Sequence, residues 1–349
     1  MVTIEDYEDY AKQRLPFGLL EYLQRGADKD ATLGRNVEAF SKVKVIPRYL
    51  IDVSNRTTKA EALGKQFKLP IGISPSGLHK RWHPDGELAT VRAAQSAGTI
   101  MIVSSAASVL FEDIAAEAPD AEKWLQIFMV DNKSVTYDFV KRAEESGFGA
   151  LVVTIDMPVK ALRYFNKKSD WKDQHKMVNY DRYDHPNRKP FLRDQATWAQ
   201  LQELINSTAL PVIVKGVLTP EDARLAYEHG AKGILISNHG GRQIDGTIST
   251  IEALSNIVKE FPEASLNGFE IYLDSGIRSG LDVFRALAIG AKFVFVGRAP
   301  MWGLFHSGQQ GLENVMEILR NELETLMGQT GCNTLQDINS NLVQYQFPF

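Results

Sequence analysis

Eight short apolar segments rich in β-branched residues recur along the chain, and most are followed by a stretch of helical periodicity. The expected strands lie near residues 69–73, 99–103, 124–128, 150–155, 212–214, 233–236, 270–273 and 293–296. The expected helices lie near residues 86–97, 134–145, 220–229, 249–259, 279–289 and 312–327. Such alternation predicts a parallel sheet, and eight units are typical of a closed (β/α)8, or TIM, barrel. An open, doubly wound sheet remains the alternative, because periodicity does not report closure.

The domain organisation follows from length and from the spacing of these segments. Barrels of this type often form one unit at 349 residues, so we expect a single domain over 1–349, with the barrel at about 69–328. Residues 3–23 and 32–40 have helical patterns, and we expect this N-terminal helical segment to cover the barrel bottom. After the fourth strand, a loop at about 160–200 is longer than a βα connection needs. It is either a surface excursion or a lid over the barrel mouth.

Composition excludes several classes of partner. With 39 basic and 43 acidic residues, the net charge of −4 gives no electrostatic case for nucleic acid or an anionic membrane. Cys332 is the only cysteine, so we expect neither a disulfide framework nor a thiolate metal site. The sequence has no signal-peptide pattern, no apolar run of about 18 residues and no peroxisomal C-terminal tripeptide. These features predict a cytoplasmic protein.

Polar and small residues follow nearly every expected strand, where barrel enzymes place their chemistry. They are Pro75, Ser76 and Gly77, Ser104, Gln126, Thr154 and Asp156, Lys215, Ser237 to Gln243, Asp274 to Arg278, and Gly297 with Arg298. Each alone is more often a turn former, a helix cap or a surface residue. Together they would bring cations, a carboxylate and an imidazole to one rim, which predicts a functional site.

The segments after the last two strands indicate a phosphate group. Gly276 and Gly297 allow close approach of backbone NH groups, and Arg278 and Arg298 each add a guanidinium. No Gly-x-Gly-x-x-Gly follows a strand, which argues against a Rossmann-type nicotinamide site. We therefore expect a phosphorylated cofactor or substrate.

One segment has a specific resemblance to a known family. It reads Ser237-Asn238-His239-Gly240-Gly241-Arg242-Gln243 and resembles the signature of the FMN-dependent L-2-hydroxy acid oxidases and dehydrogenases. That family includes glycolate oxidase, lactate oxidase and mandelate dehydrogenase. Further similarity lies at residues 15–27, 211–217, 273–278 and 297–298, so the resemblance spans almost the whole chain and is weakest at 165–197.

The resemblance implies a role for each matching residue. His239 would be the base, Asp156 its carboxylate partner, and Lys215 a catalytic cation beside the flavin N1 and C2 carbonyl. The substrate would be bound by Tyr22, Arg163 and Arg242, with Ala106 and Phe128 lining its pocket. FMN would be held by Pro75, Ser76, Gly77, Ser104, Gln126, Thr154, Lys215, Ser237, Asp274, Gly276, Arg278, Gly297 and Arg298. The chemistry suits these roles, because imidazole accepts a proton near neutral pH and guanidinium binds carboxylate through two hydrogen bonds.

Three positions depart from the glycolate oxidase pattern. Ala106 stands where that pattern has an aromatic residue, and Phe128 stands where it has a tyrosine. Both changes favour a larger, aromatic or branched 2-hydroxy acid. Gly77 replaces an alanine common in the oxidases and resembles some dehydrogenases, which leaves the electron acceptor open. The sequence has no haem domain and no membrane-anchoring insertion, which favours O2; a homotetramer is expected from the resemblance.

Other functions remain open from the sequence. The chain could be a dehydrogenase of the same family with another acceptor, or an FMN enzyme acting on a modified or peptide substrate. More remotely, Lys215 could form a Schiff base in a lyase. A non-catalytic binding protein is disfavoured, because His239, Asp156, Arg242 and Lys215 are all retained.

Overall fold

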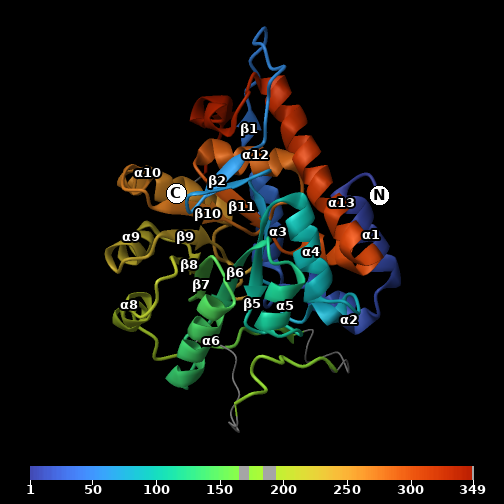
Figure 1. Ribbon diagram of the computed structural model, residues 1–349. Coiled ribbons are helices and arrows are strands. Elements are labelled where there is room, and N and C mark those ends of the chain that lie inside the picture. The colour runs from blue at the N-terminus through green and yellow to red at the C-terminus, as the bar shows by residue number, and fades with distance from the viewer. Residues whose placement is uncertain (165–172, 184–193, 348–349) are drawn as a thin grey trace.

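A closed barrel of parallel strands forms the centre of the molecule (Figure 1). The computed structural model describes residues 1–164, 173–183 and 194–347. Within these residues the barrel strands are β4 (Ile71–Ile73), β5 (Ile100–Ser104), β6 (Glu122–Ile127), β7 (Ala150–Thr154), β8 (Val212–Val217), β9 (Gly233–Ile236), β10 (Glu270–Leu273) and β11 (Phe293–Val296). Consecutive strands pair, and β11 pairs with β4 to close the ring. The prediction of a (β/α)8 barrel is confirmed, and the open sheet is excluded.

Helices surround the barrel and begin largely where the sequence predicts. They are α4 (Glu87–Ala97), α5 (Phe111–Glu117), α6 (Lys133–Glu145), α8 (Trp198–Asn206), α9 (Pro220–Glu228), α10 (Thr250–Glu260), α11 (Glu263–Leu266), α12 (Gly280–Ile289) and α13 (Arg298–Thr330). Side-chain caps fix several starts: Thr219 caps α9, Ser249 caps α10 and Ser279 caps α12. The helix starts after β8 and β10 lie within a few residues of the strand ends, whereas longer segments follow β4, β7 and β9.

The last helical region begins earlier than expected. The sequence predicts a helix over 312–327, and α13 contains this helix after the kink at Ser307 and Gly308. A first helical segment, which begins at Arg298 directly after Gly297, was not predicted. Ser307 and Gly308 have non-helical backbone angles, and this kink interrupts the apolar period. Arg298 therefore lies at the first residue of a helix rather than in a loop.

The barrel interior is filled by alternate residues of the strands, including Ile102, Trp124, Tyr272 and Phe295. A hairpin of β2 (Ala60–Ala62) and β3 (Lys65–Phe67) packs onto this cluster and closes the N-terminal end of the barrel.

The expectation that the N-terminal helices cover this end is therefore wrong. Helix α1 (Ile4–Arg14) packs against α13. The backbone after α2 (Phe17–Gln24) accepts hydrogen bonds from Arg242, which follows a strand at the opposite end. Helix α3 (Ala31–Ser41) contacts the same loop through Asn36. Helical periodicity predicts the helices but not the end of the barrel to which they bind.

The long loop after β7 is partly described, and residues 165–172 and 184–193 of the expected excursion lie outside the described residues. Residues 173–183 are docked on α5 and α6. Asn179 is fully buried and bonds to Arg142 and to the backbone of Val109 and Phe111. Tyr180 is also buried, with its hydroxyl 3.1 Å from Ser105 Oγ. This part of the loop is a packed element of the barrel mouth.

The remaining elements complete the periphery. They are η1 (His79–Arg81), η2 (Leu335–Asp337), η3 (Ser340–Leu342), and the antiparallel pair β1 (Lys44–Val45) and β12 (Val343–Gln344). No helix of the described chain is long and apolar enough to cross a membrane.

Candidate active site

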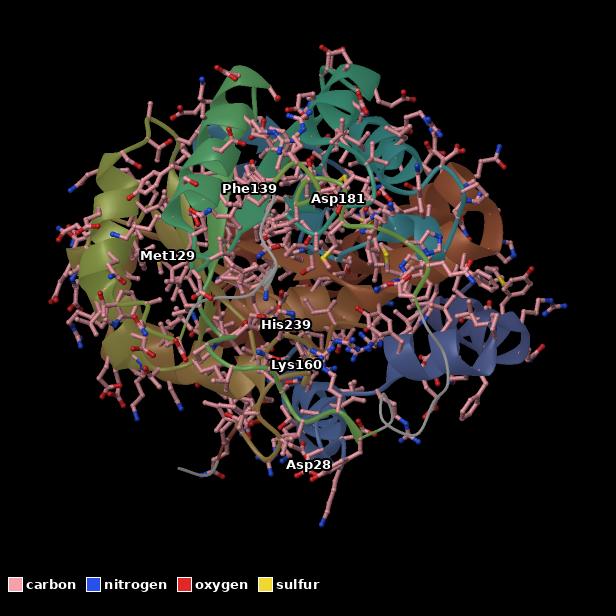
Figure 2. All side chains as sticks on the ribbon, turned by 90° about the horizontal axis from the view of Figure 1, so that it is seen from below. Asp28, Met129, Phe139, Lys160, Asp181 and His239 are labelled. Carbon is pink, nitrogen blue, oxygen red and sulfur yellow. The ribbon has the colours of Figure 1, made fainter. Side chains whose placement is uncertain are left out.

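The polar residues predicted from the strand ends gather at one end of the barrel. Figure 2 looks onto this end, with His239 near the centre of the face and Lys160, from the segment after β7, close beside it. Asp28, which follows α2, lies toward the rim in the same view. The N-terminal segment thus contributes to the face that carries the chemistry.

The loop after β9 presents His239 in a strained backbone conformation. His239, Gly240 and Gly241 have φ of 59°, 67° and 73°, which is the left-handed region. Glycine adopts this region freely, but histidine does so at a cost, and such outliers are concentrated at functional sites. The loop is held by Asn238, which exchanges two amide hydrogen bonds of 2.7 and 2.8 Å with the buried Asn36.

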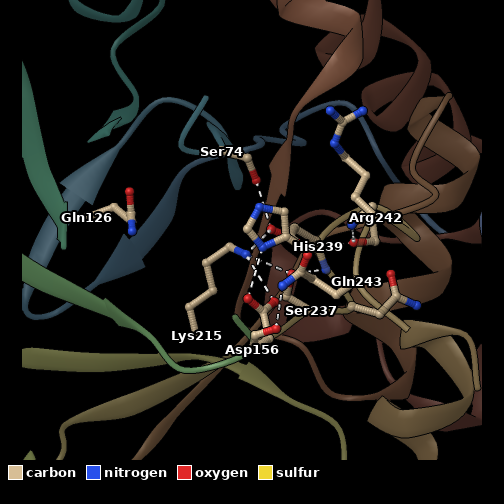
Figure 3. Close-up of polar contacts among 12 residues, drawn as sticks. Ser74, Gln126, Asp156, Lys215, Ser237, His239, Arg242 and Gln243 are labelled. Atoms are coloured by element: carbon tan, nitrogen blue, oxygen red, sulfur yellow. Dashed lines mark hydrogen bonds and ion pairs between the residues drawn. The ribbon is translucent and has the colours of Figure 1, made fainter. Parts of the chain in front are cut away.

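His239 is paired with a buried carboxylate (Figure 3). Its Nδ1 lies 2.9 Å from Asp156 Oδ1. In the neutral imidazole, Nδ1–H then donates to Asp156, and Nε2 carries the lone pair. Burial lowers the pKa of His239 below its usual value, and it outweighs the opposing attraction of Asp156. Burial alone would raise the pKa of Asp156, but the charges of His239 and Lys215 hold it below its usual value. The pair therefore presents a neutral base beside an ionised carboxylate.

A lysine lies beneath this pair. Strand β8 continues past Lys215 to Val217, with a register shift between them, so it is longer than the predicted 212–214. Lys215 Nζ donates to Ser237 Oγ at 2.9 Å and forms ion pairs with Asp156 at 3.9 Å and Asp274 at 3.8 Å. Its side chain is 4% exposed, so these contacts fix the ammonium in place. The arrangement presents a fixed positive charge at the barrel mouth.

Neighbouring strands bear buried polar atoms that lack protein partners. Gln126 Nε2 and Thr154 Oγ1 form no hydrogen bond with any described residue. Ser104 donates to Gln126 Oε1 at 3.1 Å, which orients the amide. Buried donors and acceptors normally have hydrogen-bond partners. The Gln126 and Thr154 atoms could therefore bind a heteroaromatic ligand whose edges carry hydrogen-bonding groups. An isoalloxazine ring has such edges.

Two partly buried arginines follow the last two strands. Arg278 donates to Ile277 O and lies 5.2 Å from the Trp302 ring centroid, and Arg298 donates to the carbonyls of Leu23 and Gly240. Neither forms an ion pair with a carboxylate of the described residues. Burial lowers the pKa of each, further for Arg298 because Arg242 and Arg278 are near. Two partly buried guanidinium groups without a carboxylate ion pair among the described residues fit a phosphate group.

The two flanking glycines differ in their surroundings. Gly276 has a φ of 92°, and an added Cβ would lie 2.3 Å from the carbonyl of Asn36, so this glycine is required for packing against α3. At Gly297 the nearest atom to an added Cβ is Ser74 Cβ at 3.8 Å. The backbone at Gly297 is therefore open to a ligand.

Arginines also gather near Tyr22. Arg163 donates through Nε and Nη2 to Arg242 O, and Arg242 Nη1 donates to the carbonyls of Tyr22 and Arg25. Burial and the charge of Arg242 lower the pKa of Arg163 to about 10. Neither Arg163 nor Arg242 has a carboxylate ion pair among the described residues. This part of the site is suited to a small carboxylate.

Small residues meet beside the turn after β4. A Cβ added at Gly77 would lie 3.2 Å from Ala106 Cβ and from Ala106 O. Pro75 and Ser76 of the same turn are half-buried, and Phe128 is buried at the end of β6. Gly77 and Ala106 are therefore packed closely together, and neither brings a bulky side chain to this side of the site.

Comparison with known proteins gives the family. The chain matches the FMN-dependent dehydrogenase family over residues 11–345. It belongs to that family. It is 38% identical to human 2-hydroxyacid oxidase 2 over 351 residues, 99% of each chain, and 38% identical to rice glycolate oxidase 1 over 356 residues, 97% of this chain and 94% of the rice protein.

Solved structures support the same assignment. A mandelate oxidase variant with (S)-mandelic acid superposes with a TM-score of 0.91 at 36% identity, covering 100% of this chain and 99% of its own. A soluble mutant of the membrane-associated (S)-mandelate dehydrogenase of Pseudomonas putida gives 0.93 at 31% identity, covering 99% and 100%. The resemblance identified from the sequence is confirmed, and FMN is the cofactor of this family member.

Some contacts of the candidate site were not predicted from the sequence. Ser74 donates to Asp274 at 3.0 Å and was not among the predicted residues, although it directly precedes Pro75. Gln243 belongs to the predicted segment but was given no role, and it donates to the backbone carbonyl of Asp156 at 2.7 Å. Asn36 and Arg81 lie outside the predicted motifs, and only the fold brings them to the site.

Proposed function

We propose that this enzyme oxidises an L-2-hydroxy acid to the 2-oxo acid and passes the electrons to O2, giving H2O2. The supporting observation is the juxtaposition of the His239–Asp156 pair with Arg163 and Arg242, which lack carboxylate partners among the described residues. A base and two carboxylate-binding cations are what this reaction requires. The named relatives include 2-hydroxyacid, glycolate and mandelate oxidases.

Bound FMN supplies the acceptor for the two electrons that leave the substrate α-carbon. Residues Gln126 and Thr154 would hydrogen-bond its ring, with Ser104 and Ser237 beside them. Arg278 and Arg298, with the backbone at Gly297, would bind its phosphate. Asp274, a carboxylate, would accept hydrogen bonds from the ribityl hydroxyls rather than contact phosphate. Pro75, Ser76 and Gly77 would lie along the ring, and Gly276 serves by packing.

The side chains perform the proton chemistry and the orientation. Arg163, Arg242 and the Tyr22 hydroxyl would hold the substrate carboxylate and so orient the α-carbon. His239 Nε2 would accept the hydroxyl proton as the α-carbon loses its hydrogen and two electrons. Asp156 stabilises the imidazolium that results, and Lys215 stabilises negative charge that develops on the cofactor.

Anaerobic reduction of the flavin tests this function. The purified protein is expected to be yellow and to bleach when an L-2-hydroxy acid is added without oxygen. Readmission of air should restore the colour and release H2O2 if O2 is the acceptor. A yellow protein that bleaches but reoxidises only with another acceptor is the dehydrogenase alternative. A protein bleached by no hydroxy acid would contradict the reaction class.

We further propose that the substrate is larger than glycolate, with an aromatic or branched side chain. Gly77 and Ala106 are closely packed and bring no bulky side chain to the site, and Phe128 adds a buried apolar surface. The solved relatives with mandelate compounds support this size. The acids bound by those relatives include an aromatic ring, which needs such room.

Ala106→Trp is expected to reverse this preference. The indole would add bulk to the wall of the proposed substrate pocket, so kcat/KM for L-mandelate should fall about 10- to 100-fold relative to that for glycolate. Steady-state kinetics with both acids measures the ratio, and Ala106→Ser, which adds one oxygen atom, is the matched control. An unchanged ratio in Ala106→Trp would show that the substrate side chain lies elsewhere.

The Schiff-base lyase alternative is disfavoured by the surroundings of Lys215. Schiff-base formation requires a neutral, accessible amine. The Lys215 ammonium donates to Ser237 and is ion-paired with Asp156 and Asp274. A peptide or modified substrate would also need an entry path for its chain, and no described feature favours one.

We also propose that residues 1–349 form one domain and that the chain is a cytoplasmic homotetramer. Continuity of the hydrophobic core from Tyr7 of α1 to Phe347 supports a single domain. Tyr49 and Leu50 are strongly exposed and belong to the segment between β1 and β2, which projects from the molecule (Figure 1). Such exposed apolar side chains support burial against another subunit.

A further inference from the structure

Arg81 is a third cation beside the carboxylate-binding residues. It ends the short helix η1, directly after the turn that carries Gly77. Its Cζ lies 4.3 Å from the centroid of the Tyr22 ring, compared with 4.9 Å for Arg242. The reaction as proposed uses Arg163 and Arg242 for the substrate, so Arg81 has no role in it.

The Arg81 side chain is held rigidly. It is 9% exposed, and its Nε donates to Asp173 Oδ2 at 2.7 Å, with a second contact from Nη2. Asp173 begins the docked segment 173–183, in which Asn179 and Tyr180 are buried against the barrel. An arginine has little freedom to move when its side chain is mostly buried and two of its guanidinium nitrogens contact one carboxylate.

Arg81 acts on Tyr22 together with Arg242. Both guanidinium groups lie over the Tyr22 ring, and the charges of both favour the ionised form of its hydroxyl. Guanidinium has only donors, so neither arginine can accept the phenol hydrogen. That hydrogen can be donated only to an acceptor such as a carboxylate. Trp82 supports the ring, with centroids 6.5 Å apart and planes at 29°.

We propose that Arg81 is a positioning residue for the substrate carboxylate: it fixes Tyr22 so that the phenol donates to the carboxylate, and Asp173 fixes Arg81. The inference rests on the proposed function, in which Tyr22 binds that carboxylate. The docked segment 173–183 then takes part in substrate binding indirectly: Asp173 holds Arg81, and Arg81 holds Tyr22.

The electrostatics of Tyr22 provide a direct readout. Burial raises its pKa, but the charges of Arg81 from η1, Arg242 from the loop after β9 and Arg163 from the segment after β7 lower it to about 8. Arg81 is the largest of these favourable charges, and Asp173 lies beyond it. A tyrosinate has no hydrogen to donate and repels a carboxylate. Substrate affinity should therefore weaken as the pH rises through this pKa.

The first test is a titration of Tyr22 in the holoenzyme without substrate. The ultraviolet absorbance of tyrosinate is followed against pH, and Tyr22→Phe in each background isolates the signal of Tyr22. The midpoint is expected near 8 in the wild type, to rise by about one unit or more in Arg81→Met, and to stay closer to wild type in Arg81→Lys. Arg92→Met removes an arginine that pairs with Asp85 and Glu117, away from Tyr22, and is the control.

The second test is a double-mutant cycle on substrate binding. Arg81→Met is expected to raise KM for the best hydroxy acid about tenfold, with a smaller change in kcat, and to add no further increase in a Tyr22→Phe background. Additive effects would overturn the proposal, because Arg81 would then act independently of Tyr22. An unmoved Tyr22 midpoint would also overturn it, whichever acids the enzyme oxidises. A moved midpoint in an enzyme that bleaches with no hydroxy acid would instead refute the proposed function.

Discussion

His239→Gln is expected to slow bleaching of the bound FMN by substrate about 10²- to 10⁴-fold, which is the usual contribution of a general base. The glutamine amide can still donate to Asp156, but it has no basic lone pair for the substrate proton. FMN should remain bound, because the proposed cofactor contacts lie on other residues. Stopped-flow absorbance under nitrogen measures the rate. His229→Gln, which changes a histidine at the end of α9, is the matched control and should bleach at the wild-type rate.

The pH dependence of kcat/KM is a second test of His239 as the base. The base is active when His239 is neutral, so kcat/KM should fall as the pH falls through its pKa. Burial lowers that pKa, so the acid limb should lie below the usual value of about 6.5 for histidine. Loss of the limb in His239→Gln is expected. Persistence of both the rate and the limb in His239→Gln would contradict its assignment as the base.

The fold was predictable because its signals are local. Strand segments and capped helix starts, such as Thr219 with Pro220, fixed the number and order of the barrel units. Helix α13 was underestimated because the kink at Ser307 and Gly308 breaks the apolar period. The end of the barrel that the N-terminal helices cover was wrongly predicted, since that placement depends on contacts between distant residues.

The site was predictable to the extent that its residues follow strands. His239, Asp156 and Lys215 do, and barrel closure brings Asp156 within 4 Å of both His239 and Lys215. Arg81 and Asp173 have no such signal, because one lies in a short helix and the other in an irregular loop. Their pairing is a property of tertiary structure alone. Sequence reasoning therefore predicts the reacting groups better than the residues that position them.

Lys215→Met is expected to lower the midpoint potential of the bound FMN and to slow its reduction by substrate about 10²- to 10³-fold. The ammonium is a fixed charge in a buried site, and methionine keeps its apolar length without that charge. Spectroelectrochemistry measures the potential without turnover, and stopped-flow absorbance measures the rate. Lys232→Met, at the start of β9 and exposed, is the control. An unchanged potential would place the ammonium away from the reduced flavin.

The acid limb separates the role of Lys215 from that of Asp156. The Lys215 cation disfavours the imidazolium form of His239, whereas the Asp156 carboxylate favours it. Lys215→Met should therefore raise the pKa of His239 and move the acid limb of kcat/KM to higher pH. Asp156→Asn removes the stabilising anion, so it should move the limb to lower pH while also slowing catalysis. Removal of opposite charges near His239 must shift its pKa in opposite directions. Shifts of the acid limb in the same direction in the two variants would therefore contradict the placement of both Asp156 and Lys215 beside the base.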